Sequence, residues 1–154
     1  VEQVRLRALG FESIYKLRAW TPWTPVVGGP RAETLSGGGS APASNRRLRA
    51  CLAVWARRYG VKAMLDLGCG DARWQAGIRG AGEELHYEGM DISATALQRA
   101  GQRGRNAKLA RRGPAFRQHD PALGLPSPRG RHARWDLVLA QDVLQHLADE
   151  DVLQ

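Results

Sequence analysis

The stretch LDLGCGDARW, residues 65–74, places two alternating glycines directly after an apolar run. Glycine has no Cβ, so Gly68 and Gly70 allow positive φ angles and let a ligand approach the backbone closely. Residues 61–67 have the pattern of a buried strand, so the glycines predict a tight turn at the carboxyl end of that strand. Ligands bind at such turns in open α/β sheets.

Downstream of this turn, strand patterns and helical patterns alternate. Strands are predicted at residues 86–92, 114–120 and 134–141, and helices at 72–78 and, behind the capping residue Ser93, at 94–109. Helices between strands imply right-handed crossovers and a parallel sheet, so the predicted fold class is α/β.

Upstream of the turn, the sequence predicts one clear helix and one long loop. Residues 45–59 form the helix, with Ser44 or Asn45 as its cap and Gly60 after its end. Its predicted apolar stripe consists of Leu48, Cys51, Leu52, Trp55 and Tyr59. Residues 1–19 have a weaker helical pattern, and 20–44 are rich in Gly, Pro and Ser. We expect residues 1–44 to form a helix and a lid or linker, and residues 45–154 to form the main domain.

Length and composition fit a globular domain. The chain has 154 residues, 43% of them hydrophobic. No apolar run approaches the ~20 residues of a membrane span. Its two cysteines, Cys51 and Cys69, suggest neither a disulfide framework nor a zinc site. We therefore expect a protein of a reducing compartment, by default cytoplasmic, without a metal site or a membrane partner.

Basic residues are concentrated in the segment 99–134, which begins with Arg99 and ends with Arg134. It holds ten Lys or Arg against one acid, Asp120, a local charge of +9 in a chain whose net charge is +8. This surplus predicts either contact with a polyanion such as RNA or a solvated arginine-rich face.

Acids near the strand ends indicate what the glycine turn binds. Asp91 ends the second predicted strand, 25 residues after Asp66, where a carboxylate accepts hydrogen bonds from ribose hydroxyls. A dinucleotide fingerprint would have a third glycine in place of Arg73, and Asp71 would repel a pyrophosphate. The pattern favours a cationic nucleoside, and S-adenosylmethionine, with its sulfonium, is such a ligand.

Four segments in chain order resemble the successive motifs of the class I S-adenosylmethionine-dependent methyltransferases. They are LDLGCGDARW, YEGMDIS, FRQHD and WDLVLAQDVLQHL, and the resemblance covers residues 61–154. It implies a Rossmann-like three-layer sandwich with a mostly parallel sheet of strand order 3-2-1-4. Complete members have three further strands, so the resemblance also implies a chain truncated at its C-terminus.

The resemblance also implies which residues hold the cofactor. It assigns the methionine tail to Asp66 and the backbone at Gly68 and Gly70, with Cys69 between them as a further cofactor-binding residue. It assigns the ribose to Asp91, adenine to Ile92 and to Asp120 with His119 beside it, and the space near the sulfonium to Gln141. Considered one at a time, Asp66, Asp91 and Asp120 are explained equally well as residues that cap turns and strand ends as by a role in cofactor binding. Cys69 has no evident histidine partner and fits better as a small residue between glycines than as a nucleophile.

Methyl transfer from a sulfonium is an in-line displacement that requires alignment and exclusion of water. A base is needed only for a protonated acceptor, and Asp142 and His146 are the candidates. His146 lies on an apolar strip, so a packing role is its alternative.

The acceptor is not identified by the sequence. The chain lacks both the Asn/Asp-Pro-Pro-aromatic and the Pro-Cys elements of resembling enzymes, which leaves small molecules, protein side chains and other RNA positions. The rival functions are a non-catalytic nucleoside- or RNA-binding module and an NAD-dependent oxidoreductase.

Overall fold

The computed structural model describes residues 2–20, 34–75, 78, 85–106, 115–128 and 134–148. The helices are α1 (Glu2–Leu17), α2 (Arg46–Arg58) and α3 (Ala94–Asn106), and the strands are β1 (Ala63–Leu67), β2 (His86–Asp91), β3 (Ala115–Gln118) and β4 (Leu137–Leu139). Short 3₁₀ turns occur at Gly38–Ser40, Pro121–Leu123 and Leu144–His146.

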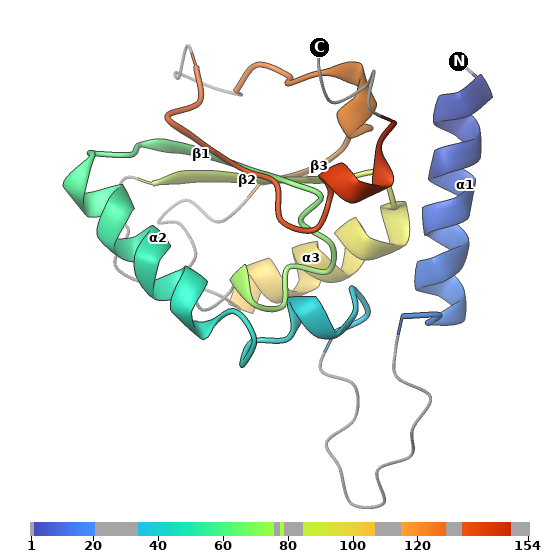
Figure 1. The fold of residues 1–154 in the computed structure, drawn as a ribbon, viewed down its shortest axis with the longest axis horizontal. Coiled ribbons are helices and arrows are strands. Elements are labelled where there is room, and N and C mark those ends of the chain that lie inside the picture. Colours follow the sequence, from blue (N-terminus) through green and yellow to red (C-terminus); the bar gives the residue numbers. More distant parts are fainter. Residues whose placement is uncertain are drawn as a thin grey trace, which may run out of the picture.

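The four strands form one parallel sheet in the order β3-β2-β1-β4, which confirms the predicted strand order. In a parallel sheet all strands end at the same edge, so the residues that follow β1, β2, β3 and β4 lie near one another. Figure 1 shows α2 and α3 on one side of the sheet and α1 standing beside its end.

Apolar side chains cover both faces of the central strands. All five residues of β1 are buried. On one face Met64 and Tyr87 pack with Trp74 and Leu52, and on the other face Leu65 packs in a separate cluster. These two layers of buried apolar side chains stabilise the sheet from both faces and so fix the positions of the strand ends.

The buried face of α2 differs from the predicted stripe. Leu52 is buried as expected, but Cys51 is exposed, and Trp55 and Tyr59 are 49% and 71% exposed. The helix instead buries its small residues Ala53 and Ala56 together with Leu52. Gly60 follows the helix with a positive φ of 61°, as the sequence predicted.

The helix predicted at residues 72–78 is wrong for the part that the structure describes. Residues 73 and 74 lie in a turn, Gln75 is in 3₁₀ conformation, and Ala72 has a positive φ of 50°, which an α-helix does not allow. Residues 76 and 77 lie outside the described chain. The cap predicted at Ser93 is confirmed, because its Oγ accepts a hydrogen bond from the Ala96 N–H at 3.2 Å. Residues 107–109 of that helix and Pro114 of the third strand lie outside the described chain.

Two arginines of the basic segment 99–134 form ion pairs with buried acidic residues. Arg103 pairs with Asp71, and Arg117 Nε lies 2.9 Å from the buried Glu88 carboxylate. Residues 107–114 and 129–133 of this segment lie outside the described chain. Among the described helices, none is long and apolar enough to cross a bilayer.

Candidate functional site

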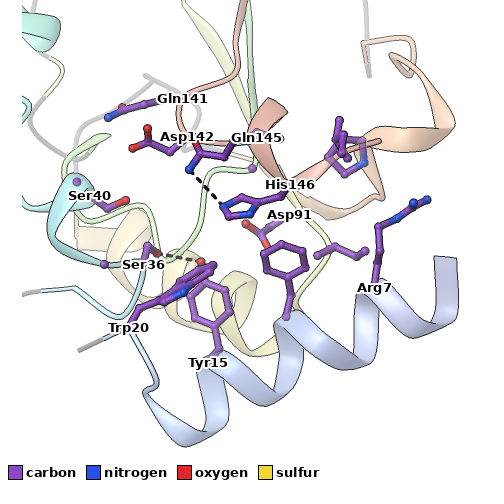
Figure 2. A pocket seen from close by; sticks show the side chains of 18 of the residues that line it. Arg7, Tyr15, Trp20, Ser36, Ser40, Asp91, Gln141, Asp142, Gln145 and His146 are labelled. Carbon is purple, nitrogen blue, oxygen red and sulfur yellow. Dashed lines mark hydrogen bonds between the residues drawn. The ribbon is translucent and has the colours of Figure 1, made fainter. Parts of the chain in front are cut away.

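A cavity of about 290 Å³ opens at the carboxyl edge of the sheet. Its walls come from α1, the Ser36–Ser40 region, the β1 turn and the segments that follow β2, β3 and β4, as Figure 2 shows. Of the residues predicted from the sequence, the ones that line it are Gly68, Asp91, Ile92, Asp120, Gln141, Asp142 and His146.

Gly68 of the glycine turn lines this cavity. Gly68 and Gly70 have φ angles of 72° and 58°, and the N–H groups of Gly68 and Cys69 both donate to the Met90 carbonyl. A Cβ on Gly68 would lie 2.2 Å from Val143, and one on Gly70 would lie 2.2 Å from the Ser36 hydroxyl oxygen. Both positions therefore require glycine, for the positive φ and for the close approach of neighbours.

Asp91 at the end of β2 points into the cavity. Its Oδ2 accepts from the Gly70 N–H and its Oδ1 from the Ser93 N–H, each at 2.9 Å. Burial raises the pKa of Asp91 to about 6, although these backbone hydrogen bonds act in the opposite direction. Each carboxylate oxygen retains acceptor capacity toward a ligand.

Asp120 after β3 also lines the cavity. Its Oδ1 accepts from the Ala122 N–H at 3.0 Å, and its Oδ2 accepts from Arg7 Nε at 3.1 Å. His119 beside it does not line the cavity, and its Nε2 lies 2.8 Å from the Gly124 carbonyl oxygen.

Asp66 and Cys69 lie behind the glycine turn rather than in the cavity wall. Asp66 Oδ2 accepts from the Tyr87 hydroxyl at 2.6 Å and from Gln75 Nε2 at 2.8 Å, and burial raises its pKa to about 6. Burial also raises the pKa of the Cys69 thiol, which keeps it protonated and a poor nucleophile.

Asp71 does not present a bare charge to a ligand, contrary to the sequence argument. It is fully buried, and its carboxylate accepts from the Thr34 hydroxyl, the Leu35 N–H and the Ser36 hydroxyl. Arg103 neutralises it. Its expected repulsion of a pyrophosphate is therefore cancelled within the fold.

An aromatic cluster closes the cavity and was missed by sequence reasoning. Phe11 and Tyr15 of α1 each pack edge-on against Trp20, with ring centroids 5.8 and 5.7 Å apart. His146 stacks on Trp20 at 6.0 Å and meets Phe11 edge-on at 5.5 Å. Residues 1–44 were expected to form a helix and a lid or linker, but the weak pattern of residues 1–19 gave no signal that α1 faces the site.

Gln141 and Asp142 form the wall after β4. Gln141 Nε2 donates to Asn45 Oδ1 at 2.8 Å, and Asp142 has a positive φ of 54°. Figure 2 shows these two side chains on the side of the cavity away from Arg7. Within the described residues, no cluster of three or more His, Cys, Asp or Glu could hold a metal ion.

The fold is shared with known methyltransferase structures. The chain resembles magnesium protoporphyrin IX methyltransferase (ChlM) from Synechocystis PCC 6803 with bound SAH, with a TM-score of 0.60, 19% identity, and coverage of 97% of this chain and 63% of that one. It also resembles StiE O-MT, with a TM-score of 0.55, 27% identity, and coverage of 72% of this chain and 38% of that one. The third structure is the methyltransferase domain of bacterial CtHen1, with a TM-score of 0.53, 23% identity, and coverage of 71% of this chain and 55% of that one. The chain thus spans less than two thirds of the length of each of these structures.

A search of curated proteins returns no match to this sequence. A family model described as a methyltransferase domain matches residues 65–154, from the glycine turn through all the cavity segments that follow it. Since this match covers more than half of the chain, the chain belongs to the methyltransferase domain family.

Proposed function

We propose that this chain binds S-adenosylmethionine in the cavity and that its methyl group passes to an acceptor by in-line displacement. The observation that carries the proposal is the buried Asp91 carboxylate, which projects beside the Gly68 turn into a cavity walled by aromatic rings. Family membership and the shared fold support the same conclusion.

The residues present fit this cofactor. Asp91 has acceptor capacity for two ribose hydroxyls, and Ile92 with Pro121 offers an apolar wall to adenine. The rings of Phe11, Tyr15 and Trp20 suit a cation, because aromatic faces attract positive charge. Asp66 lies behind the turn and bonds to Gln75, which also donates to the Cys69 carbonyl, so Asp66 would support the methionine tail through this backbone.

When bound, S-adenosylmethionine supplies an electrophilic methyl group whose bond to sulfur breaks as the bond to the nucleophile forms. The chain's own part is to align the nucleophile with that bond and to exclude water, for which α1 covers the cavity. Where the acceptor arrives protonated, His146 or Asp142 would take its proton, since both line the cavity.

Calorimetric titration of the purified chain with S-adenosylhomocysteine tests the cofactor. We expect binding to the wild-type protein and a loss of about tenfold or more in affinity on Asp91→Ala, because the ribose loses charge-assisted hydrogen bonds. NADH, the ligand of the rival oxidoreductase, should bind more weakly, and tighter binding of NADH would reject the proposal.

Transfer of a labelled methyl group tests the reaction itself. The protein is incubated with labelled S-adenosylmethionine and fractions of a cell extract, separated into small molecules, protein and RNA. Label in one fraction would identify the class of acceptor. Binding without transfer to any fraction would favour the non-catalytic module instead.

A further inference from the structure

Helix α2 and the segments on either side of it carry positive charge only. Residues 34–65 hold six Lys or Arg and no Asp or Glu. Five of these cations belong to α2, and Arg46, Arg47 and Arg58 are exposed. Figure 1 shows α2 on the opposite side of the molecule from α1. This side of the protein should therefore attract a polyanion.

Exposed apolar side chains lie among these arginines. Arg47, Cys51, Val54, Trp55 and Arg58 follow one another at helical spacing and form one exposed stripe, away from the buried residues of α2. Val54 and Trp55 are 50% and 49% exposed. Large apolar side chains gathered on one exposed face mark a surface where a partner binds.

Tyr59 continues this stripe beyond the end of the helix. It is 71% exposed, and the Arg58 guanidinium carbon lies 6.0 Å from the centroid of its ring. Trp55 and Tyr59 are four residues apart, so their side chains are neighbours one turn apart. The α2 face, as we call this surface, consists of Arg47, Cys51, Val54, Trp55, Arg58 and Tyr59.

Rings and arginines together match an unpaired nucleic acid strand. Bases stack on exposed aromatic rings and on guanidinium planes, and phosphates attract arginines. An acidic peptide would match the arginines alone and would leave Trp55 and Tyr59 without a counterpart. Unpaired bases are the usual target in sequence recognition of RNA, which favours RNA as the partner.

The first turn of α2 lies next to the cavity wall. Asn45, directly before the helix, donates to the carbonyl oxygens of Gly39 and Ala41, and Gly39 lines the cavity. The helix of 13 residues is about 20 Å long. Strand β1 follows α2 and leads back to the cavity, so α2 runs away from it. A strand bound along α2 would therefore have one end near the cavity.

We propose that the α2 face binds single-stranded RNA, with phosphates on Arg47 and Arg58 and bases on Trp55 and Tyr59, and that the bound RNA is the methyl acceptor. The acceptor role rests on the proposed function, whereas the RNA contact does not.

Fluorescence anisotropy with a labelled, unstructured RNA oligomer tests the contact. A plot of log K against log salt should have a slope of about −2, as for about three phosphate contacts of a single strand. Arg47→Gln should make this slope shallower by about 0.7, because one phosphate contact is lost. Trp55→Ala should weaken binding by about fivefold or more and leave the slope unchanged, because it removes stacking and not charge.

Two further variants serve as controls. Arg134→Gln removes an exposed arginine of the basic segment 99–134, outside the α2 face, and should bind RNA like the wild type. Equal losses on Arg134→Gln and Arg47→Gln would contradict the proposal, because any surface charge would then suffice. Trp55→Phe keeps a ring and should restore most of the affinity lost in Trp55→Ala, which separates stacking from a folding defect.

Cys51 allows a test without any substitution. It is exposed on the α2 face, whereas Cys69, the other cysteine of the chain, is buried. A maleimide should therefore modify Cys51 first, and bound RNA should slow the reaction. Unchanged reactivity of Cys51 at saturating RNA would mean that RNA binds elsewhere.

Failure of this inference is distinguishable from failure of the proposed function. A wild-type protein that binds S-adenosylhomocysteine but not RNA, or binds polyglutamate as tightly as RNA, overturns the RNA contact. A protein that binds RNA but not S-adenosylhomocysteine keeps the RNA contact and loses the proposed function with the acceptor role. Where both bind, labelled methyl should enter RNA, and label confined to small molecules or protein would overturn the acceptor role.

Discussion

Gly68 and Gly101 differ in what surrounds them, although both are glycines in ordered parts of the chain. Gly68 has a positive φ, and a Cβ on it would strike Val143, whereas a Cβ on Gly101 in α3 would meet nothing within 4 Å. A glycine inside a helix also costs folding free energy that alanine would not. Substitution of glycine by alanine should therefore lower the stability of the fold at Gly68 and raise it at Gly101.

Gly68→Ala should destabilise the protein by about 1–3 kcal/mol, because it combines a strained φ with overpacking. Gly101→Ala should stabilise it by about 0.5–1 kcal/mol. Urea unfolding of both variants measures the difference. A Gly68→Ala protein as stable as the wild type would mean that the turn can relax.

Asp66 gives the stability of the ligand-free protein a dependence on pH. Its pKa is 3.8 in the unfolded chain and about 6 in the fold, because burial disfavours the charge. The native state then holds the proton more tightly, so this stabilising effect is complete below pH 3.8 and is lost as pH rises through about 6.

Asp66→Asn should remove this dependence, because an amide oxygen can still accept from Tyr87 and Gln75. At pH 7.5 the variant should be more stable than the wild type by about 1–3 kcal/mol, and at pH 4 the gain should vanish. Denaturant titrations at both pH values provide the measurement. An equal difference at the two values would assign the effect to packing instead of charge.

The chemistry of single residues was only partly readable from the sequence. A carboxylate at the end of β2 was predicted to face the site, and Asp91 does line the cavity. Asp71 was expected to act on a ligand through its charge, but Arg103 neutralises it. That ion pair depends on a residue 32 positions later, which local patterns cannot show.

At the scale of elements, α1 is attached to the start of α3 by polar contacts in addition to the packing of Tyr15 against Leu35 and Ala96. Glu12 accepts hydrogen bonds from the Ser93 and Thr95 hydroxyls and from the Thr95 N–H at the start of α3. Burial alone would raise the pKa of Glu12, but these donors, with Lys16, lower it from 4.5 to about 2. The ionised carboxylate is therefore the form that holds α1 to α3.

Glu12→Gln should loosen α1. Amide hydrogen exchange in this helix should become faster by about tenfold, as expected for lost hydrogen bonds to a charged group. Because the pKa is lowered in the fold, wild-type protection should be full above pH 4.5 and fall as the pH drops toward 2. Glu2→Gln, at the exposed start of the same helix, is the control and should exchange like the wild type.

Elements with a strong local signal were predicted well, and elements shaped by packing were not. Apolar runs predicted the four strands, and the hydroxyl of Ser93 predicted the cap of α3. The buried face of α2 instead includes the small residues Ala53 and Ala56, which the predicted stripe of larger apolar residues did not contain. Residues 73 and 74 form a turn and not an α-helix, next to Gln75, whose side chain bonds to Asp66 and to the Cys69 carbonyl.

For the whole molecule, ligand binding and stability are linked. A ligand that binds only the folded state at a hundred times its dissociation constant adds about 2.7 kcal/mol. In a domain of this size S-adenosylhomocysteine should therefore raise the melting temperature by about 5–10 °C. At the same concentration Asp91→Ala, which binds about tenfold or more weakly, should show about half of this shift or less. A shift with NADH larger than that with S-adenosylhomocysteine would contradict the proposed cofactor.

The sheet order could be predicted because parallel strands with helical crossovers permit few arrangements. The cavity could not, because its walls include side chains from α1 that lie far from the strands in the sequence. The charge pattern was also incomplete as a guide, since Arg103 and Arg117 of the basic segment pair inside the fold.

The contacts of α1 bear on the order of events during synthesis. Arg7 bonds to Asp120, 113 positions later, and Phe11 packs against His146, which is translated later still. While the chain is still being synthesised, α1 therefore exists before the residues that it contacts have been added. Contacts between such distant parts form slowly, so in refolding experiments nucleoside uptake should appear with the last kinetic phase, after the secondary-structure signal has recovered.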